Sequence, residues 1–376
     1  MRPVLSVLCL LLCACVTPPK PKPEPKKVLE PAEVIRETIE AAYKAVGAGD
    51  GDTLETLFTD DALVFGLGPS DTWTGSTVIG DRARQALIPI GLAGDTVKFE
   101  DSVIVVGLDD SDDTAWAFDL PKVITTHKGK TETWLPRITL HLVREFDKWK
   151  IDALHVSLAV ADALVFAPDA TKRLVAPADV TNDRSPESDQ LVGVVKRSLD
   201  DYAVKVDRTS ERPEFVQLGT SQVEVFIGGK PFKDLIKPSL PQIKKAGYTW
   251  KIDGNLRVKL AKNGRSGWAA AVVVQRSGSG KKAQVFPAFR YLWTLVEENG
   301  VWNVSSEHQS LAVKEEMRDA ATDEQLKNWQ LAHDAADKAL ANNRGGKGGG
   351  ESKKAAKGDD AAPKKGDEKK DDIGAW

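Results

Sequence analysis

Four polar side chains in the first half of the chain have the chemistry of a proton-transfer site. Asp119 interrupts an apolar run, and Arg137, His141 and His155 come from segments predicted to be neighbouring strands. A carboxylate close to an imidazole is an arrangement used in general acid–base catalysis. An aspartate in a strand also commonly faces solvent, and a histidine beside a serine commonly makes a structural hydrogen bond. We favour the structural interpretation and keep catalysis as the alternative.

Signatures of metal, nucleotide and serine-hydrolase chemistry are absent from the sequence. The five histidines show no H-x-H or H-x-x-x-H spacing, and the three cysteines lie near the N-terminus, so we predict no metal site. No G-x-G-x-x-G, P-loop or G-x-S-x-G motif occurs, and we expect no cofactor. The net charge is -3 and the isoelectric point about 6.1, which favours no nucleic-acid partner.

An internal repeat places some of these residues in both halves of the chain. The segments Arg137–Val160 and Arg290–Val313 align without a gap. They share an arginine, a tryptophan, a histidine and the run Ser-Leu-Ala-Val. Such a repeat indicates two domains related by duplication. His155 recurs as His308 in the more divergent copy, whereas His141 is replaced by Thr294, which favours a structural role for the recurring histidine.

The elements predicted around these residues give an α+β fold. Apolar residues at helical spacing predict a helix through residues 35–46, a short second helix opened by Asp52, and a third helix at 81–88. Alternating patterns predict strands that follow these helices. Helices followed by an antiparallel meander indicate a curved antiparallel sheet with helices packed on one face. The long predicted strands are residues 97–107, 114–125, 132–144 and 148–158.

Strand parity predicts which side chains of the last strand lie together. The residues expected to share one face are Trp149, Ile151, Ala153, His155 and Ser157.

The motifs of the first half resemble the nuclear transport factor 2-like superfamily, and within it the SnoaL-like branch. They are A-A-Y-K-A-V-G-A-G-D, a later W-x-G and G-D-x-A, and the closing W-K-I-x-x-x-H-x-S. The resemblance covers residues 33–160 and, in divergent form, residues 188–314. It implies two tandem cone-shaped domains, each with an apolar pocket between its helices and its sheet.

The resemblance also implies candidate pocket residues. Tyr43 falls where ketosteroid isomerases of the superfamily place a tyrosine that donates a hydrogen bond to an oxyanion. Their general base falls on Gly66 and their second donor on His141, so the isomerase arrangement is broken. The ligand-pocket residues that we expect are Tyr43, Asp119, Arg137, His141 and His155.

The N-terminus resembles a bacterial lipoprotein signal. Residues 1–15 contain one arginine, a short apolar run and the sequence Leu-Cys-Ala-Cys, which is similar to a lipobox and implies cleavage before an acylated Cys15. An ordinary signal peptide is the alternative. Residues 16–32 are rich in Pro and Lys and predict a stiff spacer. Val16 favours, by resemblance to lipoprotein sorting rules, the outer membrane facing the periplasm, with the lipid bilayer as a partner.

The remaining segments predict connections and a tail. We expect a linker at residues 161–187, an amphipathic helix at 315–342 and a disordered charged tail at 343–376. The two repeats are expected to pair through their sheets as an intramolecular pseudo-dimer. The apolar residues expected in that contact are Leu140, Leu154 and Trp293.

These observations favour an envelope-anchored lipoprotein with two non-catalytic domains over an enzyme. The domains would bind a small apolar ligand or serve as a scaffold for an envelope protein. The alternative is an acid–base enzyme of isomerase, cyclase or dehydratase type that uses the pocket of the first domain.

Overall fold

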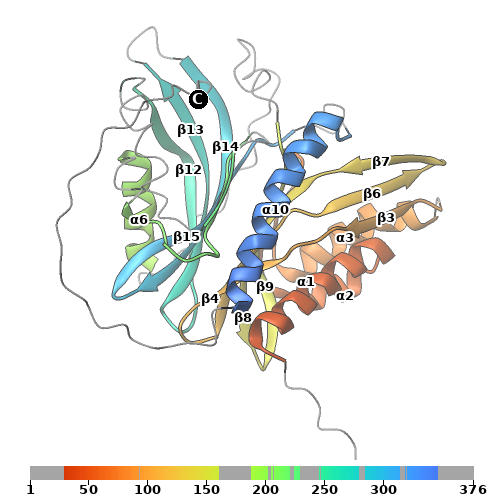
Figure 1. The fold of residues 1–376 in the computed structure, drawn as a ribbon, viewed down its shortest axis with the longest axis horizontal. Coiled ribbons are helices and arrows are strands. Elements are labelled where there is room, and N and C mark those ends of the chain that lie inside the picture. The colour runs from red at the N-terminus through yellow and green to blue at the C-terminus, as the bar shows by residue number, and fades with distance from the viewer. Residues whose placement is uncertain are drawn as a thin grey trace, which may run out of the picture.

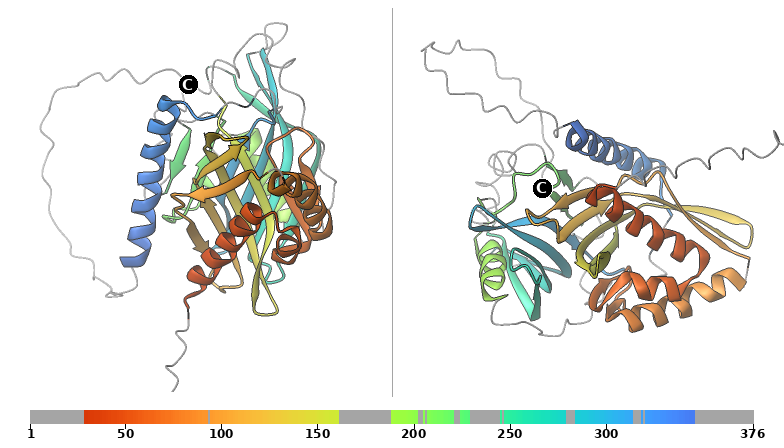
Figure 2. Two further views of the ribbon diagram at one scale, coloured as in Figure 1. Left: turned by 90° about the vertical axis from the view of Figure 1, so that its right-hand side faces the viewer. Right: turned by 90° about the horizontal axis from the view of Figure 1, so that it is seen from below.

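Two curved sheets lie face to face, with helices on their outer faces (Figures 1 and 2). The computed structural model describes residues 29–92, 94–160, 188–201, 205, 207–220, 224–228, 245, 247–278, 284–313, 318 and 320–345. Cys15, most of the spacer, the linker and nearly all of the charged tail lie outside these ranges. The chain is an α+β protein, as the sequence predicts, and its two sheet bodies are consistent with the two tandem domains expected.

The first domain has a main sheet in the order β2-β1-β9-β8-β5-β4 and a smaller sheet in the order β3-β6-β7. Three predicted long strands each divide in two. Pro121 and Pro136, which cannot donate a hydrogen bond to a sheet, lie where two of the divisions occur, and Asp101 has a positive φ of 49° near the third. The elements are α1 (Pro31–Ala48), α2 (Gly51–Leu57), β1 (Phe58–Phe65), β2 (Thr72–Thr74), α3 (Ser76–Leu92), β3 (Thr96–Glu100), β4 (Val105–Leu108), β5 (Thr114–Asp119), β6 (Lys122–His127), β7 (Lys130–Trp134), β8 (Pro136–Glu145) and β9 (Lys148–Leu158).

The second domain repeats this strand order as β11-β10-β15-β14-β13-β12. In each sheet the first strand in chain order, β1 or β10, runs parallel to the last, and the other neighbours are antiparallel. Trp116 lies opposite His141, and Trp268 lies opposite Thr294 at the matching position. The elements are α6 (Asp189–Asp200), β10 (Val216–Leu218), β11 (Val225–Ile227), β12 (Thr249–Leu260), β13 (Ser266–Ser277), β14 (Gln284–Glu298) and β15 (Val301–Ser310), followed by α10 (Asp323–Gly345).

The helices bury the apolar faces predicted for them. Ile35, Ile39 and Ala42 of α1 pack into the core of the first domain, and α1 ends at Gly49, whose φ of 69° suits glycine. α2 is capped by Asp50, whose side chain accepts a hydrogen bond from the backbone N–H of Thr53 at 2.9 Å, and not by the predicted residue 52. The cap comes two residues earlier than predicted, directly after Gly49.

A bulge in β9 makes the predicted strand parity wrong. His141 pairs with Ala153 and the next residue of β8 pairs with Ile151, so Asp152 is the extra residue. A bulge reverses the faces that follow it. Ile151 therefore packs in the core of the first domain, whereas His155 faces the second domain.

This bulge and a matching one at Ser305 of β15 correct the residues expected between the domains. The apolar residues Leu140, Leu154 and Trp293 pack inside their own domains. A separate apolar cluster joins the two sheets, and its members are Leu63, Phe65, Ala153, Trp268, Ala270 and Leu292.

The C-terminal helix begins at Asp323, eight residues later than the predicted start at residue 315. Thr322 and Gln325 form a capping box: the backbone N–H of Thr322 donates to Gln325 Oε1 at 2.8 Å, and the backbone N–H of Gln325 donates to Thr322 Oγ1 at 3.3 Å. α10 then crosses both domains (Figure 1). Its Ala336 and Leu340 pack with apolar residues from β4, β5 and β10.

Candidate functional site

Two histidines meet at the centre of the contact between the sheets. His155 of β9 and His308 of β15 stack with their ring centroids 3.8 Å apart, and both are completely buried. His155 Nε2 is 2.7 Å from Ser310 Oγ of the second domain, and His308 Nε2 is 2.7 Å from Ser157 Oγ of the first. We call the four residues His155, His308, Ser157 and Ser310 the histidine seam. Its contacts are reciprocal between the two copies of the repeat.

Two arginines extend this reciprocity. Arg137 donates to the carbonyl oxygen of Gly219, at the turn that follows β10. Its counterpart Arg290 donates to the carbonyl oxygens of Gly66 at 2.8 Å and Gly68 at 2.7 Å, at the turn that follows β1. Each arginine thus holds the turn of the other domain. Gly66, which occupies the position of a catalytic base by resemblance, is a turn residue in contact with the second domain.

The backbone closes the same arrangement at the ends of the repeats. The N–H of Val160 donates to the carbonyl oxygen of Thr220 at 2.9 Å, and the N–H of Val313 donates to that of Leu67 at 3.3 Å. The repeated Ser-Leu-Ala-Val runs therefore each reach across to the opposite domain.

Burial sets the charges in the seam. It lowers the pKa of His155 and of His308 well below the usual value. The charges of Arg290 and Arg137 add to this for His155, and those of His155 and Arg137 add to it for His308. Burial also lowers the pKa of Arg137 and of Arg290 to about 10. At neutral pH the imidazoles are therefore uncharged and the guanidinium groups keep their protons.

A histidine within hydrogen-bond distance of a serine also occurs in catalytic sites, where the histidine acts as the base that activates the serine. Nucleophile–base pairs in enzymes are completed by a group that orients the imidazole. His155 Nδ1 has no hydrogen-bond partner among the described residues, and His308 Nδ1 is 3.0 Å from Thr139 Oγ1, a neutral hydroxyl. Ser157 and Ser310 are at most 2% exposed, which leaves them no access to substrate. The geometry supports packing and hydrogen bonding, not nucleophilic attack.

The bulged Asp152 forms a second buried polar cluster between the domains. Its carboxylate accepts hydrogen bonds from Thr59 Oγ1 at 2.8 Å, from Trp268 Nε1 at 2.7 Å and from Lys259 Nζ, and it lies 3.4 Å from His141 Nδ1. Burial raises the pKa of Asp152, but the close contact with His141 and the charge of Lys259 outweigh burial and hold that pKa below its usual value. Asp152 is ionised and links β9 to β12 and β13.

Tyr43 and Asp119 form a separate pair inside the first domain. Tyr43 Oη donates to Asp119 Oδ2 at 3.0 Å, and the ring of Tyr43 stacks on Phe99 with centroids 4.3 Å apart. Asp119 is fully buried and also accepts from the backbone N–H groups of Val103 and Leu120. Burial raises the pKa of Asp119 against these hydrogen bonds, and burial together with the charge of Asp119 raises that of Tyr43 well above its usual value.

The five predicted pocket residues thus do not form one site. Tyr43 and Asp119 meet in the first domain, whereas Arg137, His141 and His155 face the second domain. Several important residues were not singled out from the sequence. Two of them, Arg290 and Ser310, are repeat partners of Arg137 and Ser157, so symmetric pairing of the repeats was the signal that could have found them. The others are Asp152, Lys259 and Gln325.

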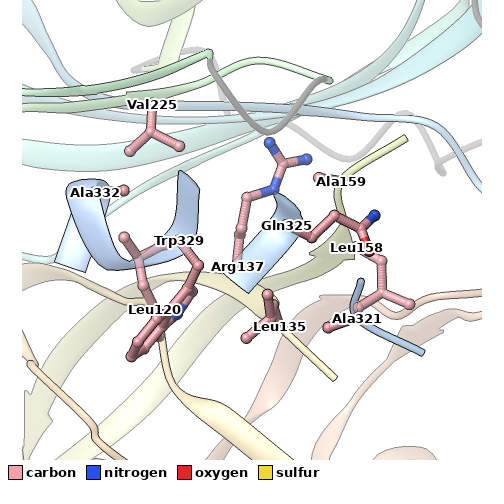
Figure 3. Close-up of a pocket in the computed structure, with 10 residues that line it drawn as sticks. All are labelled: Leu120, Leu135, Arg137, Leu158, Ala159, Val225, Ala321, Gln325, Trp329 and Ala332. Atoms are coloured by element: carbon pink, nitrogen blue, oxygen red, sulfur yellow. The ribbon is translucent and has the colours of Figure 1, made fainter. Parts of the chain in front are cut away.

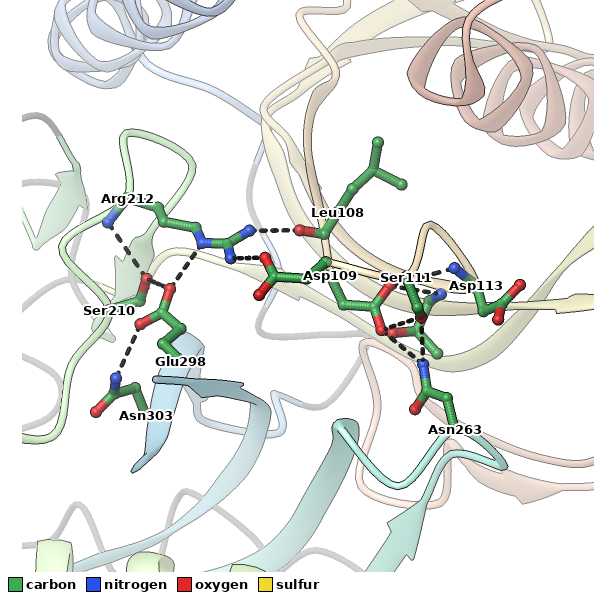
Figure 4. A network of polar contacts seen from close by, with 11 residues as sticks. Leu108, Asp109, Ser111, Asp113, Ser210, Arg212, Asn263, Glu298 and Asn303 are labelled. Atoms are coloured by element: carbon green, nitrogen blue, oxygen red, sulfur yellow. Dashed lines mark hydrogen bonds and ion pairs between the residues drawn. The ribbon is translucent and has the colours of Figure 1, made fainter. Parts of the chain in front are cut away.

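A third polar cluster lies at the edge of the contact between the sheets (Figure 4). Arg212 donates to the carbonyl oxygen of Leu108, and pairs with Asp110 at 2.8 Å and with Glu298 at 2.7 Å. Asn263 Nδ2 donates to Asp109 Oδ2 at 2.6 Å. The loop between β4 and β5 is thereby tied to the second domain.

A pocket lies where α10 passes over the two domains (Figure 3). Its open space, mouth included, is about 510 Å³. Arg137 contributes to its wall from β8, and Trp329 is fixed in place by donating from Nε1 to the carbonyl oxygen of Leu120 at 2.7 Å. The lining residues are Leu120, Leu135, Arg137, Leu158, Ala159, Val225, Ala321, Gln325, Trp329 and Ala332.

The part of the chain that the structure describes holds neither a metal cluster nor a membrane-spanning helix. There, no three His, Cys, Asp or Glu side chains come close enough to hold one metal ion. No described helix has both the length and the apolar character needed to cross a membrane.

Comparison with known proteins places the first domain in a family. Among solved structures, a putative dehydratase of the NTF2-like family from Streptomyces avermitilis is 16% identical and covers 35% of this chain and 97% of its own, with a TM-score of 0.31. An NTF2-like protein with a cystatin-like fold from Novosphingobium aromaticivorans is 20% identical over 35% and 84% of the two chains, also with a TM-score of 0.31. No curated protein matches. The family model of the SnoaL-like domain matches residues 35–161, so the first domain is SnoaL-like.

Proposed function

We propose that this chain is a non-catalytic binding or scaffolding protein whose two domains form one unit. The observation that carries the proposal is the histidine seam. The histidine and serine that both copies of the repeat retain are hydrogen-bonded to each other across the domains, and the shared arginine holds the opposite turn. Residues that maintain a contact of this kind are not available to a substrate.

The two domains would act as an intramolecular pseudo-dimer. In a two-fold contact, residue i of one copy meets residue j of the other, and j meets i. His155 with Ser310 and His308 with Ser157 follow this rule, as do Arg137 and Arg290 with the opposite turns. Because the copies are covalently linked, their effective concentration favours pairing within the chain over pairing between chains.

Acylated Cys15 would anchor this unit to the outer membrane facing the periplasm. The support is the Leu-Cys-Ala-Cys sequence followed by the Pro/Lys-rich spacer. Metabolic labelling with a radioactive or clickable fatty acid should mark the wild type and not Cys15→Ser. Equal labelling of both would refute the anchor.

Whether the protein is catalytic can be tested by asking if a molecule that it retains is released unchanged or as a converted product. Native mass spectrometry of the purified chain should show either the bare mass or a bound small molecule that is released unchanged on denaturation. Release of a chemically converted product, lost in Asp119→Asn, would overturn the proposal.

That outcome would support the second candidate, an acid–base enzyme in the first domain. The specific observation in its favour is the hydrogen bond from Tyr43 to the buried Asp119. The raised pKa of Tyr43 keeps its hydroxyl protonated as a donor. We rank this candidate second because Asp119 is already engaged by Ser102 and by two backbone N–H groups.

A further inference from the structure

The turn between β8 and β9 carries the most exposed large apolar side chain in the part of the chain that the structure describes. Phe146 is 97% exposed, so its ring gains almost nothing from packing within that part. Its backbone is also unusual, because φ is 47° at Phe146 and 63° at Asp147, in the left-handed region that disfavours bulky side chains. The turn therefore combines backbone strain with an exposed aromatic ring.

The duplicated copy forms the same turn without either feature. Asn299 and Gly300 join β14 to β15 at the matching position, with φ values of 54° and 76°. A two-residue turn of this kind needs a positive φ at both positions, and Asn-Gly is a preferred sequence for it. The fold therefore does not require a phenylalanine here. A strained position that the fold does not require points to a contact outside the described chain.

The β8–β9 turn lies at the end of the molecule where the described chain begins. Figure 1 and the left-hand view of Figure 2 show the tip of this hairpin and the start of α1 together at the lower end. The segment before α1 leads back to Cys15, the proposed site of acylation. A lipid anchor would therefore bring this end towards the bilayer. The β14–β15 turn lies on the side away from α1 (Figure 1).

The charges of the hairpin leave one positive group beside the ring. Arg144 pairs with Asp147 at 3.0 Å, and Glu145 lies 4.0 Å from Lys150. Lys148 is exposed and has no ion pair with any described residue. Its long side chain can reach a lipid phosphate while the ring lies deeper. An apolar tip with one cation beside it suits the boundary between headgroups and acyl chains.

An acidic loop beside the hairpin argues against recruitment by charge. Residues 109–113 join β4 to β5 and include four aspartates. The backbone N–H of Arg144 donates to the carbonyl oxygen of Asp113 at 2.8 Å, which places this loop at the base of the hairpin. Carboxylates so close oppose attraction to anionic lipids. Contact with a bilayer at this end has to come from the ring.

We propose that Phe146 inserts into the headgroup region of the bilayer and fixes the orientation of the two domains on the membrane. One aromatic ring binds a bilayer weakly, but an anchor in the same chain keeps it at a high effective concentration near the surface. This docking rests on the proposed acylation of Cys15 and deepens it by adding a second point of contact.

A probe at position 146 tests the insertion. The cysteines of the chain are Cys9, Cys13 and Cys15, so cleavage before an acylated Cys15 leaves no free thiol, and Phe146→Cys provides a unique site for nitrobenzoxadiazole. The full chain is reconstituted in vesicles of phosphatidylcholine, alone or mixed with phosphatidylglycerol. In both, the emission should shift to shorter wavelength, and nitroxide-labelled lipids should quench it. Asn299→Cys, at the matching turn, should keep the emission that it shows in water.

Flotation of the same vesicles separates this docking from the proposed anchor. A chain that does not float with the vesicles refutes the anchor, and with it a docking that depends on the anchor. A chain that floats with the probe at position 146 in water refutes the insertion alone. A shift seen only with phosphatidylglycerol, or equal quenching at positions 146 and 299, would also overturn it. A thiol at position 146 that is open to reagents in vesicles but protected in native membranes would indicate a protein partner instead.

The turn of the second copy provides a variant that keeps the fold. Phe146→Asn/Asp147→Gly gives the first domain an Asn-Gly turn, so the melting temperature should stay unchanged or rise as the strain is removed. Nitrobenzoxadiazole on Lys148→Cys should be quenched by nitroxide-labelled lipids beside Phe146 and lose that quenching in the Asn-Gly variant. A lower melting temperature would show that Phe146 supports the fold, and unchanged quenching would show that the ring does not hold the hairpin at the bilayer. Either result would overturn the docking.

Discussion

The contacts of the histidine at positions 155 and 308 explain why both copies of the repeat retain it. Each imidazole stacks on the other and bonds to a serine of the opposite domain. A change in either histidine therefore removes a partner from both domains. Interior residues have no such constraint, and Leu154 of the first domain corresponds to Glu307 in the second. There Glu307 accepts from Lys205 at 2.6 Å and from Trp293 at 2.9 Å.

The buried histidines predict that acid destabilises the protein. Their pKa values are lowered in the folded state, so below pH 6.5 the unfolded chain binds more protons and folding loses free energy as the pH falls. For two histidines the loss between pH 7 and pH 5 is at most about 4 kcal/mol, the limit set by the unfolded-state pKa. Urea unfolding at both pH values should show it, and the double variant His155→Gln/His308→Gln should flatten the dependence. His127→Gln, at a histidine whose side chain is 64% exposed, should not; an unchanged slope in the double variant would contradict this account.

Asp152 and Asp61 offer a matched comparison because both bond to Lys259. Asp152 is buried and has three other partners, so Asp152→Asn should cost about 2–4 kcal/mol. The Asp61 side chain is 56% exposed, and Asp61→Asn should cost less than about 1 kcal/mol. Denaturant unfolding measures both. Because the folded pKa of Asp152 is lowered, its contribution is present above pH 4 and is lost only at lower pH, outside the histidine range. Similar losses in the two variants would rule out Asp152 as the important partner.

At the scale of elements, the sequence predicts the helices and strands better than it predicts which way their side chains face. Periodicity located α1 and β9 because local spacing determines them. It missed the bulge at Asp152, since an extra residue in one strand is defined by pairing with another strand. His155 was misassigned for the same reason, because it lies beyond the bulge and faces the second domain. Tyr43 and Asp119 meet inside the first domain, whereas the sequence had suggested a histidine as the partner of Asp119.

The start of α10 was predictable in principle. Thr322 and Gln325 have the spacing of a capping box, whereas the prediction relied on apolar residues alone. The contact that holds α10 on the first domain could not be predicted from local sequence, because Trp329 donates a hydrogen bond to the backbone of Leu120, which is remote in sequence.

Trp329 should therefore control how firmly α10 is held. Its ring is 7% exposed and lies under Lys122 Nζ at 4.3 Å from the ring centroid. Trp329→Ala should weaken the docking of α10 by about 3–5 kcal/mol, which hydrogen exchange would detect as faster exchange of the amides of α10. Leu331→Ala, at a side chain 65% exposed, is the control and should leave exchange nearly unchanged. Equally slow exchange in the Trp329 variant would mean that other contacts hold the helix.

At the scale of the whole molecule, the contact between the sheets is polar at its centre and at its edges. The histidine seam, the Asp152 cluster and the Arg212 cluster lie in the same contact as a small apolar group that includes Phe65 and Trp268. Buried polar groups must be paired correctly, so this contact tolerates few alternative arrangements. The sequence indicated pairing of the copies through their repeat, but the contact residues depended on the bulges in both sheets.

Such a contact predicts that the two domains stay together after the chain between them is cut. A protease site introduced between residues 161 and 187 would separate the copies covalently, and the two pieces should still co-elute as one compact particle of the mass of a single chain. Ala153→Glu places a carboxylate in the apolar group between the sheets, where it has no designed partner, and the cut variant should fall apart. Ala335→Glu, at an exposed position of α10, should co-elute like the cut wild type. Separation of the cut wild-type pieces, or a stable dimer of the uncut chain, would show that the reciprocal contacts do not hold the copies together within one chain.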